Sequence, residues 1–183
     1  MERLRHGPCR RSVRLKGFDY SRAGAYFVTV VCKDRACLLG IVDAGDLRLN
    51  AAGRQVREVW QHLAGRFPSV VMDACVIMPN HVHGIVVLAP QVERAVGAGL
   101  ALLAAGAASS APTLSDVVRA FKSVSAIAAN RALGRSGQPL WQRSYYDRVI
   151  RDEEELQRYR QYVAENPLKW ALDRENPTRI VAG

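Results

Sequence analysis

The strongest constraint on the fold is an alternating segment from His81 to Leu88, which reads H-V-H-G-I-V-V-L. Side chains of a β-strand point to opposite faces with period two, so one face carries both histidines and the other only small or apolar residues. At about 3.3 Å per residue, the two imidazoles stand about 6.6 Å apart at their backbones. Imidazole suits several divalent transition metals, so the pair fits a metal site that takes a third ligand from elsewhere. It also fits two exposed or hydrogen-bonded strand histidines.

The charge of the chain favours a polyanionic partner. Its 183 residues suit one domain with a real core and some appendages. The formal net charge is +9, and most of the basic residues are arginines, which bind phosphates through their planar fork. Residues 1–24 are predicted to form a basic N-terminal arm in which Arg11, Arg14 and Lys16 contact nucleic acid. A disordered, solubilising tail is the alternative for this segment.

Other broad classes are disfavoured. No apolar run is long enough for a membrane span, and the N-terminus lacks the apolar segment of a signal peptide, so we expect a cytoplasmic protein. The cysteines form no C-x-x-C pair, and we expect them to be reduced and in part buried. The sequence also has no P-loop, so we expect no nucleotide cofactor.

The first half of the chain predicts strands on both sides of a helix. Strands are expected at 25–32 and 36–42, followed by a short edge segment at 47–49. Asn50 is expected to cap a helix over 51–66, which carries one apolar stripe and ends before Pro68. Strands at 70–78 and 81–88 are expected to pair in antiparallel fashion across the turn at Pro79.

The second half opens with a spacer and a second helix. Residues 89–112 are rich in Ala, Gly and Ser and are predicted to be a flexible spacer. Thr113 and Asp116 have the spacing of a capping box at the start of a helix over 113–133. Its expected buried residues are Leu114, Val117, Val118, Phe121 and Val124. Arg119 and Lys122 lie off this stripe, where they could reach phosphates.

Residues 140–150 mix aromatic and basic side chains. Such mixing suits single-stranded nucleic acid, whose bases stack on rings while its phosphates meet arginines. Trp141, Arg143 and Arg148 are the candidates for these contacts. An amphipathic edge strand is the alternative for this segment.

The last predicted helix follows a cap at Asp152 and Glu155 and ends before Pro167. Tyr159 lies on its inward stripe and is interpreted as structural. Tyr162 lies to one side of that stripe, and Asn166 is its neighbour one turn later. These two polar residues form a pair at the edge of the helix.

Four motifs, in this order, resemble the single-tyrosine HUH transposases, and among them the REP-associated tyrosine transposase-like proteins. They are M-P-N-H-V-H-G-I (78–85), F-K-S (121–123), L-W-Q-R-S-Y-Y-D-R-V-I-R-D-E-E (140–154) and Y-V-A-E-N-P (162–167). The N-terminal R-R-S-V-R-L-K-G-F-D-Y and A-Y-F-V-T-V are also similar to that family. The resemblance covers nearly everything except the 89–112 spacer.

The resemblance implies an α+β, ferredoxin-like fold, with a central antiparallel sheet, helices packed on one side and a C-terminal catalytic helix. A single catalytic domain would span 25–172 and be followed by a tail at 173–183. His81, His83 and Asn166 match the family's metal ligands, and Tyr162 matches its nucleophile.

The implied activity is DNA transposition: cleavage and rejoining of single-stranded DNA, usually near a hairpin, through a 5′-phosphotyrosine. Mg²⁺ and Mn²⁺ both suit the His/His/Asn ligands. Some relatives are homodimers that share active sites, and others act as monomers. The leading alternative is a non-catalytic protein that binds single-stranded nucleic acid on the same fold. A metallohydrolase ranks lower, because no carboxylate ligand is evident near the histidines in sequence.

Overall fold

The computed structural model describes residues 23–89 and 112–178. Most of the arm, most of the spacer and the end of the tail lie outside these ranges, together with Arg11, Arg14 and Lys16. The described strands are β1 (Gly24–Val31), β2 (Gly40–Asp43), β3 (Asp46–Leu49), β4 (Val70–Ile77), β5 (His81–Leu88) and β6 (Tyr146–Ile150). The α-helices are α1 (Ala51–His62), α2 (Leu114–Ala132) and α3 (Glu153–Glu165).

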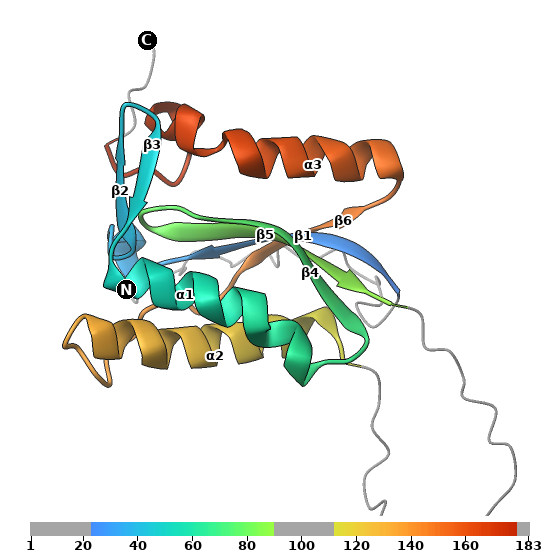
Figure 1. Cartoon of the computed structure of the whole chain (residues 1–183), viewed down its shortest axis with the longest axis horizontal. Helices are drawn as coiled ribbons and strands as arrows, with labels where there is room; N and C mark the ends of the chain where they lie inside the picture. The colour runs from blue at the N-terminus through green and yellow to red at the C-terminus, as the bar shows by residue number, and fades with distance from the viewer. Residues whose placement is uncertain (1–22, 90–111, 179–183) are drawn as a thin grey trace, which may run out of the picture.

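The main sheet has four strands in the order β4-β5-β1-β6, and every neighbouring pair is antiparallel. The chain passes from β1 through α1 to β4, and from β5 through α2 to β6, so each helix connects two strands that are separated by a third. Helices α1 and α2 cover one face of the sheet, and α3 lies across the other face (Figure 1). This arrangement confirms the expected ferredoxin-like fold with its additional C-terminal helix.

The alternation of β5 sorts its residues between two layers. Val82, Val86 and Leu88 enter the main core with α1 and α2. His81 and His83 point to the opposite face, where α3 packs. A smaller cluster on that face joins Val163 of α3 to Val76 and Met78. The predicted faces of the strand are therefore confirmed, and the polar face lies beneath a helix.

Side chains cap the three helices as the sequence predicts. The Asn50 side chain accepts a hydrogen bond from the backbone of Gly53, and Thr113 and Asp116 form a complete capping box. Asp152 accepts from the amide of Glu155. Each helix start is thus fixed by its own sequence. The first helix is shorter than expected, because α1 ends at His62 and residues Leu63–Arg66 form a 3₁₀ turn.

One predicted core residue of α2 is wrong: Val124 is 39% exposed. The buried stripe instead continues through Ser125 and Ala129. Ser125 donates to the carbonyl of Phe121 and accepts from the indole nitrogen of Trp141. A small residue is needed there because the Trp141 ring fills the adjacent space.

Two predicted strand segments differ from expectation. The strand expected at 36–42 begins only at Gly40, and among the described residues β2 and β3 form a separate hairpin beside the main sheet (Figure 1). Of the segment 140–150, only Tyr146–Ile150 forms a strand, and it is the edge strand that pairs with β1.

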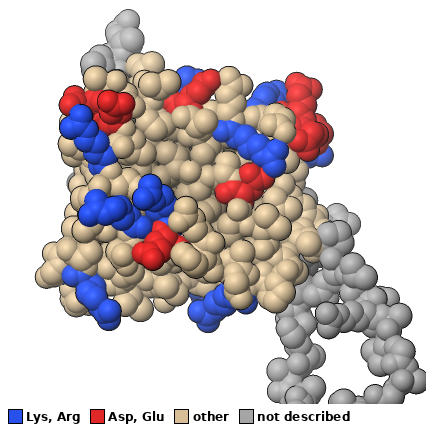
Figure 2. All heavy atoms as spheres, viewed as in Figure 1, with Lys and Arg blue, Asp and Glu red and all other residues tan. Residues whose placement is uncertain are grey.

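Neither disulfides nor a membrane helix occur in the described ranges. Cys32, Cys37 and Cys75 are free, and Cys32 is buried. None of the helices there has the length and apolarity to cross a membrane. On the surface that Figure 2 shows, in the same view as Figure 1, basic and acidic side chains are interspersed.

Candidate active site

The two histidines lie side by side on β5, on the face covered by α3. Their ring centroids are 4.4 Å apart, and their side chains are 0% and 5% exposed. His83 lies opposite Thr29 on β1, and His81 lies opposite Val31. Because β5 is paired on both sides, the sheet fixes the spacing of the two imidazoles.

Each imidazole is oriented by a neighbour at its Nδ1 atom. The amide oxygen of Asn80 lies 2.8 Å from Nδ1 of His81, and the hydroxyl of Thr29 lies 2.8 Å from Nδ1 of His83. Asn80 Oδ1 is an acceptor, so His81 carries its proton on Nδ1 and leaves a lone pair on Nε2. That Nε2 atom is buried without a hydrogen-bond partner in the described part of the chain.

Both histidines are neutral near pH 7. Burial lowers the pKa of His81 to about 3. Burial, together with repulsion from His81, lowers the pKa of His83 to about 3. Neutral imidazole is the form that ligates a metal, so the pair is ready for coordination without losing a proton.

The two tyrosines of α3 differ in their contacts and exposure. Tyr159 stacks on Phe27 with ring centroids 4.5 Å apart, in agreement with a structural role. Tyr162 is 39% exposed, and its hydroxyl lies 3.4 Å from Nε2 of His83. Burial and the nearby Asp173 carboxylate raise the pKa of Tyr162, so its hydroxyl is protonated at neutral pH.

Asn166 lies at the end of α3 and is 2% exposed. Its Nδ2 atom donates to Asp173 at 3.4 Å. Its Oδ1 atom is buried and has no hydrogen-bond partner among the described residues. A buried amide oxygen without a partner is costly, so Oδ1 is suited to an electrophile that is bound at the site.

Asp173 is a site residue that the sequence reasoning missed. The sequence assigns it to the start of the predicted tail, yet its Oδ2 atom lies 3.8 Å from Nε2 of His81 and its side chain is 5% exposed. Ligand atoms of Asp173 and the two histidines all lie within 4.8 Å of one another. Asp173 follows a 3₁₀ helix over Pro167–Leu172 and belongs to no motif or periodic stripe. Its position beside the histidines depends on the path of the chain after α3, which the sequence pattern does not reveal.

The residues present fit a divalent metal ion. Two neutral imidazoles and one carboxylate lie within 4.8 Å of one another, and the Asn166 amide lies beside that carboxylate. Mixed nitrogen and oxygen ligands of this kind suit Mn²⁺ and other first-row ions, and the oxygen ligands suit Mg²⁺.

The segment that carries Asp173 is tied to the turn between β4 and β5 and to the 3₁₀ turn that follows β1. Asn80 donates from Nδ2 to the carbonyls of Arg35 and Glu175, at 3.0 and 2.7 Å. Arg35 also forms an ion pair with Glu175 at 2.9 Å. Asn80 therefore positions His81 and Asp173 at the same time.

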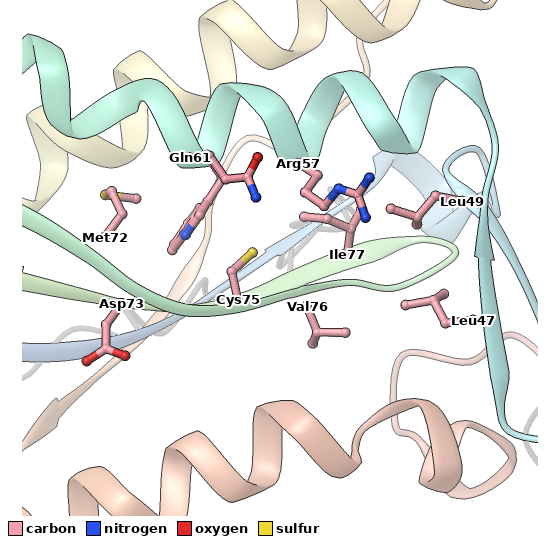
Figure 3. Close-up of a pocket in the computed structure, with 10 residues that line it drawn as sticks. Leu47, Leu49, Arg57, Gln61, Met72, Asp73, Cys75, Val76 and Ile77 are labelled. Atoms are coloured by element: carbon pink, nitrogen blue, oxygen red, sulfur yellow. The ribbon is translucent and has the colours of Figure 1, made fainter.

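A cavity of about 260 Å³ opens beside Tyr162. Its lining residues are Phe27, Thr29, His83, Tyr146, Tyr162, Asp173, Arg174 and Glu175. A larger pocket of about 400 Å³ lies elsewhere, between α1, β3 and β4, and contains none of the predicted site residues (Figure 3). The candidate chemistry thus lies in the smaller cavity.

The residues predicted to contact nucleic acid lie on both sides of the sheet. Arg148 is exposed on the site's face of β6 and lies 3.6 Å from Glu155. Arg119, Lys122 and Arg143 lie on the other side of the sheet and line a second cavity. The prediction for Trp141 is wrong, because its ring packs in the core against Phe121 and cannot stack on a base.

Comparisons with known proteins agree with this architecture. The chain is 36% identical over 169 residues to an uncharacterized protein of Haemophilus influenzae, a match that covers 90% of this chain and 91% of that protein. No family model matches. A solved REP-associated tyrosine transposase bound to a REP hairpin superposes with a TM-score of 0.55 and 20% identity, covering 85% of this chain and 73% of that one. The expected resemblance is therefore confirmed in the fold.

Proposed function

Because the chain belongs to the family of the Haemophilus influenzae protein and has the fold of a REP-associated tyrosine transposase, we propose that it cleaves and rejoins single-stranded DNA. The observation that carries the proposal is the convergence of Tyr162 on the buried His81–His83 pair. A protein that only binds DNA has no need of an exposed tyrosine at a cluster of buried metal-ligating side chains. The proposed substrate is DNA with a hairpin, as in the solved complex of the structural neighbour.

His81, His83 and Asn166 are the proposed metal ligands, and Asp173 is a further one. Nε2 of His81 and Oδ1 of Asn166 support this assignment, because both are buried and lack protein partners in the described ranges. A bound Mg²⁺ or Mn²⁺ would neutralise charge on the scissile phosphate. Thr29 and Asn80 hold the imidazoles in the required orientation.

Tyr162 is the proposed nucleophile. Its hydroxyl oxygen attacks the phosphorus, a new oxygen–phosphorus bond forms, and the bond from phosphorus to the 3′-oxygen breaks. The tyrosine proton is balanced by the proton gained at the free 3′-hydroxyl. A 3′-hydroxyl of the same or another DNA end reverses these steps, so the phosphodiester energy is conserved in the phosphotyrosine and no nucleotide triphosphate is required.

Trapping the covalent intermediate tests this function. The protein is incubated with hairpin DNA that carries a single-stranded 5′ overhang and Mn²⁺, and SDS-resistant protein–DNA adducts are resolved on a gel. We expect an adduct that is lost in Tyr162→Phe and retained in Tyr146→Phe and Tyr159→Phe. An adduct that persists in Tyr162→Phe would refute the nucleophile, and absence of any adduct would favour a binding protein without catalysis.

A further inference from the structure

A second cavity lies on the opposite side of the sheet from Tyr162. Both cavities lie next to the edge strand β6. It has a volume of about 230 Å³ and is formed by α2 and the residues that precede β6. Its lining residues are Ser115, Val118, Arg119, Lys122, Arg143 and Tyr145. Three of these six side chains are basic, and none belongs to the candidate active site.

Two consecutive tyrosines connect this cavity to the active site. Tyr146 pairs with Thr29 on β1 and lines the cavity beside Tyr162. Tyr145 precedes it, packs against the core on the α2 side and lines the second cavity. β6 is an edge strand that pairs only with β1 in the described sheet. A strand of DNA that leaves the active site over this edge therefore meets the second cavity next.

Lys122 fixes the rim of the second cavity. Its ammonium donates to the carbonyls of Gln142 and Arg143 at 2.7 and 2.8 Å, with that of Ser144 at 3.5 Å. The Lys122 ammonium thus uses its three N–H donors on three successive carbonyls, so it is not available to bind a phosphate directly. It instead holds the loop from which the side chains of Arg143 and Tyr145 project.

Arg143 and Arg119 supply the hydrogen-bond donors that a phosphate in this cavity would need. Arg143 is exposed, and the side chain of Arg119 is 74% exposed, although one of its amino groups forms an ion pair with Asp116 at 2.6 Å. Exposed guanidinium groups bind phosphate oxygens through several donors, and an aromatic ring beside them offers a surface for a base. The combination fits a nucleotide of single-stranded DNA.

We propose that this cavity is a second DNA subsite, which binds a backbone phosphate of the single strand that crosses the β6 edge, with Arg143 as its main contact. The proposal rests on the proposed function only in its choice of DNA as the ligand. It assigns Lys122 a positioning role, through the 142–144 loop. In this proposal, one cavity binds the DNA strand beyond the scissile phosphate, and the other holds Tyr162 and the cleavage chemistry.

Binding of fluorescein-labelled single-stranded DNA tests the subsite in a Tyr162→Phe background, where cleavage cannot interfere. Affinity is measured by anisotropy at several salt concentrations for Arg143→Gln and for Arg131→Gln. Arg131 is an exposed arginine near the end of α2, outside the cavity, so the control removes the same charge. We expect Arg143→Gln to bind about tenfold more weakly and to reduce the slope of log K against log salt by about 0.7.

The control decides the result. Equal affinity and equal slope in Arg143→Gln and Arg131→Gln would overturn the subsite, even if the adduct at Tyr162 forms normally. Conversely, an Arg143-dependent slope with no adduct in the active protein would leave the subsite standing and reject the proposed cleavage. Inorganic phosphate is added as a competitor, and displacement of DNA at low millimolar phosphate would indicate a site for the free anion instead.

Discussion

At the scale of single residues, the site depends on side chains that touch the histidines at Nδ1. Groups of this kind set the tautomer of a metal-ligating imidazole, and their loss costs roughly 10- to 100-fold in metal affinity. Thr29 offers a clean test because valine has nearly the same shape. We expect Thr29→Val to bind Mn²⁺ roughly 10- to 100-fold more weakly by calorimetry, with Thr29→Ser close to wild type. Equal affinities in the three proteins would contradict this role for Thr29.

The same buried histidines predict how stability depends on pH. Their pKa is about 3 in the folded protein and near 6.5 in the unfolded chain, so the unfolded state binds more protons between these values. Stability is therefore complete above about pH 6.5 and is lost as the pH falls toward 3. With EDTA present, we expect urea titrations to show a free energy of unfolding that falls steadily as the pH drops from about 6.5 toward 3.

A matched pair of variants checks the origin of that slope. His83→Gln is expected to flatten the pH profile, whereas His62→Gln, at an exposed position on α1, is expected to leave it unchanged. An identical slope in both variants would mean that other groups control acid unfolding.

At the scale of elements, the close approach of α1 to β5 depends on one glycine. A β-carbon at Gly84 would overlap the indole ring of Trp60, which packs over the strand. Alanine has less backbone entropy to lose than glycine, but the steric overlap outweighs this gain. We expect Gly84→Ala to lower the free energy of unfolding by roughly 1–3 kcal/mol in urea titrations. Gly65→Ala, where nothing lies within 4 Å of the new β-carbon, should stay within about 0.5 kcal/mol.

The segment after α3 also acts as an element, because it carries Asp173 back to the histidines. If the carboxylate is a ligand, Asp173→Asn removes its charge at nearly constant shape and should weaken Mn²⁺ binding at least about tenfold. Glu175→Gln removes an acid from the same segment, but that acid is paired with Arg35 rather than aimed at the histidines. We therefore expect calorimetry to show little change for Glu175→Gln. Equal losses in both variants would indicate a general charge effect.

At the scale of the whole molecule, the sequence predicted the strands of the main sheet and the helix caps, because these depend on local periodicity and on short-range hydrogen bonds. It predicted His81 to Leu88 as a strand with the bounds that the structure shows. It did not predict Asp173 or the burial of Trp141. Both depend on how distant segments pack. The position of Asp173 depends on the turn after α3. The burial of Trp141 depends on the small size of Ser125, beside which its ring packs.

The position of β5 inside the sheet has a consequence for motion. β5 is hydrogen-bonded to β4 and β1 along its length, whereas α3 is attached through side chains such as the Arg160–Asp73 ion pair and the Tyr159–Phe27 stack. The amides of β5 can exchange hydrogen only when the sheet opens, whereas those of α3 can exchange when the helix alone detaches. The two histidines and Tyr162 therefore lie on elements of unequal local stability, and we expect hydrogen exchange to be faster in α3 than in β5.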